Sequence, residues 1–135
     1  MSALTLEWVA KSESDFHLAV IAAQTAEPPE PEGICFHAQQ CVEKYAKAFL
    51  VERGVGFERS HSMPYLQTLC ASVDSEFDRF KTDFEALDDY SVDIRYPGES
   101  ATEEEARAAL DIATRLRAFF RLKLGLDQPS TPEGA

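Results

Sequence analysis

The side chains best suited to chemistry gather on one stripe of a predicted helix that spans about residues 34–53. The stripe carries two amides, one carboxylate and two ammonium groups: Gln39, Gln40, Glu43, Lys44 and Lys47. Phe36 and Leu50 lie at its two ends, and a polar stripe bounded by exposed apolar residues can serve as an interface. An ordinary solvated helix face is the alternative that these residues leave open.

An arginine at the end of a later predicted helix is the best candidate for binding an anion. Arg95 comes directly before Tyr96 and Pro97, and the proline restricts the backbone that precedes it. The guanidinium group of Arg95 is therefore fixed in place and can clamp an anion. A structural ion pair with Asp93 or Glu99 is the alternative.

The histidines offer one further candidate and no metal site. His61 lies in a predicted loop, where it can cap the next helix, contact a phosphate or act in catalysis. A site made of His37, Cys35 and Cys41 has poor geometry, because positions two and six residues apart do not share one helix face. The aspartates of residues 83–93 are typical of the hydrated face of a helix. We therefore expect neither a metal nor a cofactor.

Composition limits the size and the partners of the protein. Its 135 residues have room for one domain, and 13 basic against 24 acidic residues give a net charge of −11. That charge repels phosphate backbones, so nucleic-acid binding is disfavoured. Three cysteines, an odd number, indicate reduced core thiols of a cytoplasmic protein. Without a basic leader or a long apolar run, we expect neither secretion nor membrane insertion.

Apolar residues recur with helical spacing in five segments, and no segment alternates long enough to predict a strand. The predicted helices cover about residues 6–26, 34–53, 62–73, 77–96 and 102–123. Ser62 can cap the short third helix, and Thr102 with Glu105 has the pattern of a capping box. We therefore predict an all-α fold, an antiparallel bundle of four main helices plus one short helix. Residues 1–126 form this bundle, and residues 127–135 form a disordered tail.

Three segments in order along the chain carry a family resemblance. Residues 36–63, FHAQQCVEKYAKAFLVERGVGFERSHSM, contain a glutamine pair, a Glu-Lys pair and a loop that ends in His-Ser. Together with residues 8–16 and the Ile-Arg-Tyr-Pro-Gly run of residues 94–98, this segment resembles the HEPN family of small helical prokaryotic domains. The resemblance implies a homodimer with a polar groove near Arg95 and the glutamine pair. It also implies a nucleotide or nucleotidyltransferase partner, since small HEPN chains often accompany a nucleotidyltransferase encoded beside them.

Many HEPN proteins resemble metal-independent ribonucleases, whose motif is an arginine followed after four to six residues by a histidine. The histidine exchanges a proton with the 2′-hydroxyl or the leaving group, and the arginine stabilises the phosphorane charge. Arg95 stands at the arginine position, but the places for the histidine hold Ser100, Ala101 and Thr102. We therefore expect a binding or partner module that is not a self-sufficient enzyme.

Six residues are expected to line the ligand groove: Arg95, Tyr96, Gln39, Gln40, Lys44 and His61. One alternative is a degenerate ribonuclease of a toxin–antitoxin system, with a site around Arg95, Tyr96 and His61. The other is a purely structural interaction module. Apolar residues left over from a four-helix core are expected to pair across the homodimer, and they include Phe36, Leu50 and Phe120.

Overall fold

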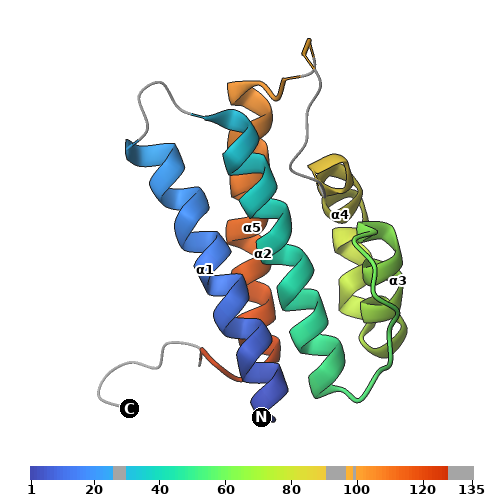
Figure 1. The fold of residues 1–135 in the computed structure, drawn as a ribbon. Coiled ribbons are helices and arrows are strands. Elements are labelled where there is room, and N and C mark those ends of the chain that lie inside the picture. Colours follow the sequence, from blue (N-terminus) through green and yellow to red (C-terminus); the bar gives the residue numbers. More distant parts are fainter. Residues whose placement is uncertain (26–29, 91–96, 99, 128–135) are drawn as a thin grey trace, which may run out of the picture.

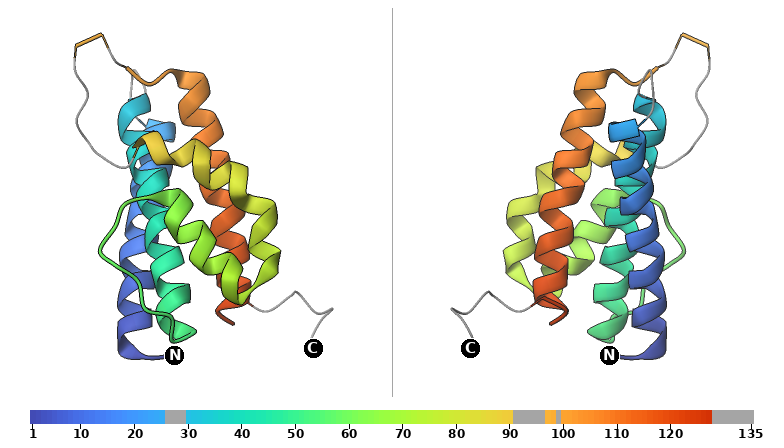
Figure 2. Two further views of the ribbon diagram at one scale, coloured as in Figure 1. Left: turned by 90° about the vertical axis from the view of Figure 1, so that its right-hand side faces the viewer. Right: turned by 90° about the vertical axis from the view of Figure 1, so that its left-hand side faces the viewer.

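Helices make up all the regular structure in the part of the chain that the computed structural model describes, residues 1–25, 30–90, 97–98 and 100–127. Three long helices, α1 (Ala3–Thr25), α2 (Pro31–Glu52) and α5 (Glu103–Lys123), lie side by side in Figures 1 and 2. The shorter helices α3 (Met63–Val73) and α4 (Lys81–Leu87) pack on the side of α2 that faces away from α1. The predicted all-α class is confirmed.

Local signals at the helix ends act as the sequence predicts. The Ser62 side chain accepts a hydrogen bond from the backbone N–H of Tyr65 at 3.3 Å, which caps α3. At the start of α5, the Glu105 N–H donates to Thr102 Oγ1 at 3.0 Å and the Thr102 N–H donates to Glu105 Oε1 at 2.9 Å, a complete capping box. Each bond involves residues only three positions apart, so nearby sequence is enough to predict it.

The predicted helix of residues 77–96 is not one continuous α-helix. Its described part divides into the 3₁₀ helix η1 (Ser75–Phe80), α4 and the 3₁₀ helix η2 (Asp88–Tyr90), while residues 91–96 lie outside the described residues. A 3₁₀ helix has three residues per turn, so Phe77 and Phe80 both contact Phe119 of α5, with ring centroids 5.1 and 4.8 Å apart. The apolar spacing therefore predicted the buried face correctly but not the type of helix.

The core is rich in aromatic rings and includes two side chains that were expected outside it. Tyr45 stacks on Phe120, and Phe49 packs against Phe77 with ring centroids 4.8 Å apart. Leu50 and Phe120 are fully buried in this cluster, so the expectation that they remain for a dimer surface is wrong. The physical reason is that α3 packs against α2 and that Phe77 of η1 fills the space between Phe49 and Phe120.

Candidate functional site

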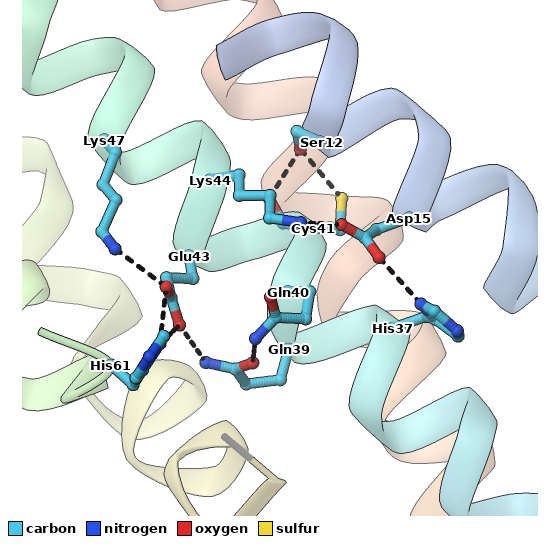
Figure 3. Close-up of polar contacts among 10 residues, drawn as sticks. All are labelled: Ser12, Asp15, His37, Gln39, Gln40, Cys41, Glu43, Lys44, Lys47 and His61. Carbon is cyan, nitrogen blue, oxygen red and sulfur yellow. Dashed lines mark hydrogen bonds and ion pairs between the residues drawn. The ribbon is translucent and has the colours of Figure 1, made fainter. Parts of the chain in front are cut away.

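A buried carboxylate on α2 collects three hydrogen-bond donors. Glu43 is 2% exposed, and its oxygens accept from the Gln39 amide at 2.8 Å and from Lys47 Nζ at 2.9 Å. Both partners lie four residues away on the same helix, so they share its face. The third partner is His61, whose Nδ1 lies 3.0 Å from Glu43 Oε2 (Figure 3). We call Gln39, Gln40, Glu43, Lys47 and His61 the Glu43 network.

The network continues from Glu43 toward the start of α3. The Gln40 amide donates to Gln39 Oε1 at 2.7 Å, and the Gln39 amide also contacts Met63 Sδ at 3.2 Å. Met63 in turn donates its backbone N–H to the Asp88 carboxylate of η2 at 2.9 Å. Gln39, Gln40 and Lys47 are all buried, so the alternative of an ordinary solvated face is wrong. This part of the stripe is polar but covered by α3, η2 and the loop that precedes α3.

His61 is the member of the network that solvent reaches. Its side chain is 66% exposed. It belongs to the loop of residues 53–62, which returns from the end of α2 to the start of α3 (Figure 2). This loop places it beside Glu43 (Figure 3). Because Nδ1 faces the carboxylate, Nε2 is the ring nitrogen left for another contact. A protonated imidazole in this position can donate to an anion, and a neutral one can exchange a proton. His61 does not cap α3, since Ser62 does so.

Lys44 belongs to a separate cluster on the α1 side of α2. Its Nζ lies 2.6 Å from Asp15 Oδ2, and His37 Nδ1 lies 2.8 Å from Asp15 Oδ1 (Figure 3). Asp15 is buried in α1, so these contacts join the two helices. The structure therefore brings Gln39, Gln40 and His61 together and places Lys44 apart from them.

Arg95 and Tyr96, the remaining predicted groove residues, lie outside the described residues. The last described residue before them is Tyr90, whose hydroxyl group donates to Glu105 Oε2 at 3.0 Å. Burial and this hydrogen bond both raise the pKa of Tyr90 above its ordinary value. On the other side of Arg95 and Tyr96, Gly98 has a φ of 92°. This value lies in the left-handed region that glycine adopts without strain, as expected for a turn at Pro97-Gly98.

A third charged cluster, which the sequence did not predict, joins α1, α2 and α5. Arg117 donates to both oxygens of Glu13 at 2.7 and 2.8 Å, and the Tyr45 hydroxyl group donates to the same carboxylate. Arg121 donates to the Tyr45 oxygen at 3.1 Å. Burial raises the pKa of Glu13, but the bonds from Arg117 and Tyr45 outweigh it and hold the pKa below its ordinary value. The spacing of Arg117 and Arg121 on one face of α5 was the signal in the sequence.

The described residues show neither a metal site nor a membrane-spanning helix. No group of three or more His, Cys, Asp or Glu side chains there is arranged to hold a metal ion. Among the same residues, no helix has the length and apolar character needed to cross a membrane.

Comparisons with known proteins agree with this fold. The model of the HEPN domain matches residues 5–123 of the chain. The crystal structure of ST0689, an archaeal HEPN homologue, superimposes with a TM-score of 0.71 at 23% sequence identity, and the match covers 91% of this chain and 99% of that one. At that identity the likeness shows a shared fold. No curated protein matches the sequence.

Proposed function

Because the chain belongs to the HEPN family, we propose that it is a binding and partner module of that family, without an enzymatic activity of its own. Its ligand would be a nucleotide, and its protein partner a nucleotidyltransferase. We further propose that it works as a homodimer in the cytoplasm. The ligand, the partner and the dimer are what the resemblance of residues 36–63 and 94–98 to the HEPN family implies for this chain.

The observation that carries the proposal is the contrast between buried Glu43 and exposed His61. Burying a carboxylate and an ammonium group costs several kcal/mol per ion unless their hydrogen bonds are satisfied. Here Lys47 and Gln39 satisfy Glu43, and the carboxylate holds a histidine that solvent can reach. Apolar side chains would pack this face of α2 at a lower cost. Such an arrangement favours a role for His61 outside the protein's own core.

The proposed ligand contacts are His61, Arg95 and Tyr96. Gln39 is fully buried and Gln40 nearly so, and we assign them to holding Glu43 in place behind His61. Lys44 was expected in the same groove, but its contact with Asp15 favours a role in packing α1. In a chain with a net charge of −11, an anion needs local cations, and protonated His61 and Arg95 would supply two.

Titration calorimetry with AMP, ATP and GTP tests the proposal. A charge-assisted contact is worth about 1.5 to 3 kcal/mol, so Arg95→Ala should weaken nucleotide binding by about tenfold to a hundredfold. His61→Gln should weaken it by about tenfold, and the exposed Arg107→Ala serves as the control. Native protein that binds none of these nucleotides, or variants with unchanged affinity, would reject the nucleotide part of the proposal.

The protein partner and the dimer have tests of their own. A nucleotidyltransferase reading frame beside the gene, and co-purification of its product with this chain, would support the partner. Absence of both would count against it. Light scattering at tens of micromolar should report twice the mass of 15.1 kDa, and a monomer would contradict the homodimer.

A degenerate ribonuclease is the second candidate, and the carboxylate-held imidazole of His61 favours it. A histidine oriented through Nδ1 can exchange a proton through Nε2. We nevertheless expect no cleavage of single-stranded RNA by the purified chain, since the family's histidine is missing after Arg95. Cleavage that both His61→Gln and Arg95→Ala abolish would establish the ribonuclease instead.

A further inference from the structure

A surface groove between η1, α4 and α5 exposes apolar side chains. Its volume is about 560 Å³, and its lining includes Phe80, Phe119 and Leu122. Leu122 is 50% exposed, and Phe119 is only partly covered. An exposed leucine beside a partly covered phenylalanine is typical of contact surfaces between proteins. The groove shares no residue with the Glu43 network or with the cluster of Asp15, His37 and Lys44.

An arginine that lies on two aromatic rings borders this groove. The guanidinium carbon of Arg79 is 5.0 Å from the ring centroid of Phe80 and 4.9 Å from that of Phe119. No carboxylate of the described residues lies within ion-pair distance of Arg79. Stacking orders the guanidinium plane and leaves the N–H donors at its edge available to an incoming carboxylate.

One charged side chain of the groove has no ion-pair partner among the described residues. Arg115 and Asp83 also line the groove, and they neutralise each other through two hydrogen bonds of 3.1 and 3.2 Å. Asp111 binds Arg115 from outside the lining. Arg79 is therefore the uncompensated charge among the lining residues, on a chain whose net charge is −11. An apolar groove with one positive edge complements an apolar surface that carries carboxylates.

We propose that this groove docks an acidic amphipathic helix of a partner protein. Leucine-type side chains of that helix cover Phe119 and Leu122, and one of its carboxylates pairs with Arg79. Aromatic and arginine side chains are the residue types that most often dominate the binding energy of protein interfaces. The proposal is independent of the nucleotide site, because it shares no residue with the Glu43 network.

Designed peptides of about 15 residues test the charge preference directly. One has leucines on one helix face and glutamates beside them, the second replaces each glutamate by glutamine, and the third replaces each by lysine. Binding is followed by the backbone amide NMR signals of the intact chain. Non-specific attraction to a chain of charge −11 favours the lysine peptide. A preference of about fivefold for the glutamate over the glutamine peptide, with shifts around residues 79–83 and 115–122, therefore supports the groove.

Variants separate the proposal from its alternatives. Arg79→Gln should remove the preference for glutamate, and Leu122→Ala should weaken all three peptides. Arg107→Gln, an exposed arginine elsewhere on α5, is the matched control and should change nothing. Equal binding of the glutamate and glutamine peptides, no saturable shift, or an equal loss in the control would overturn the proposal. So would a dimer that Leu122→Glu converts to a monomer in light scattering, because the groove would then hold a second copy.

Discussion

The buried pair of Glu43 and Lys47 allows a quantitative test of how this domain is built. Glu43→Leu removes the carboxylate at similar volume and leaves the Lys47 ammonium group, whose side chain is 8% exposed, without its ion-pair partner. Removing one member of a buried ion pair costs about 3 to 5 kcal/mol. Lys47 Nζ also lies 5.4 Å from the ring centroid of Trp8, which keeps some stabilisation. We therefore expect a loss of about 3 kcal/mol in the free energy of unfolding.

The double variant Glu43→Leu with Lys47→Met should be far more stable than the two single changes suggest. It removes both charges together, and an apolar pair of similar volume is often neutral in such a position. We expect the double variant to lose about 1 kcal/mol, at least 2 kcal/mol less than the sum of the single losses. Urea unfolding of the four proteins, followed by far-ultraviolet circular dichroism, measures each value.

Two outcomes would refute this reasoning. A loss below about 1 kcal/mol for Glu43→Leu, or single losses that simply add, would mean that the two groups are not a coupled buried pair. The double variant also tests function, because it folds without the carboxylate that holds His61. If nucleotide affinity is unchanged in it, the Glu43 network has no part in binding.

Three further predictions follow from the structure. Glu13→Gln should be less stable than the native chain above about pH 5, because the lowered pKa of Glu13 means that its ionised form stabilises the fold. In urea unfolding this difference in stability should shrink toward pH 3, as acid protonates Glu13 in the native chain. An equal difference at pH 3 and above pH 5 would contradict this. Burial raises the pKa of Cys41 and of Cys70 to about 12, so both thiols should resist a thiol reagent at about pH 8 in the native state and react once urea unfolds the chain. Thr102→Ala should cost about 1 kcal/mol by removing the cap of α5, and an unchanged melting temperature would show that the capping box adds nothing.

The sequence predicted what depends on near neighbours and failed where distant segments decide. Ser62 and Thr102 were identified as caps because each bonds to a residue three positions along the chain. The burial of Gln39 and Glu43 could not be predicted from helix periodicity. It depends on η2 and on the loop before α3, which reach α2 only in the folded chain. Polar residues on a helix look the same in sequence whether solvent or another segment covers them.

The two sides of α2 also differ in what they offer a ligand, and Lys44 tests that difference. Its ammonium group is bound to Asp15, which also binds His37. The side chain of His37 is 28% exposed, whereas the side chain of His61 on the other side of α2 is 66% exposed. An engaged ammonium group must leave its partner before it can bind an anion, and Asp15 would then be buried with only His37. Lys44→Ala should therefore lower the melting temperature by loosening α1 from α2. In calorimetry, this variant should bind nucleotide with the same affinity as the native chain. Weaker nucleotide binding at an unchanged melting temperature would return Lys44 to the ligand site.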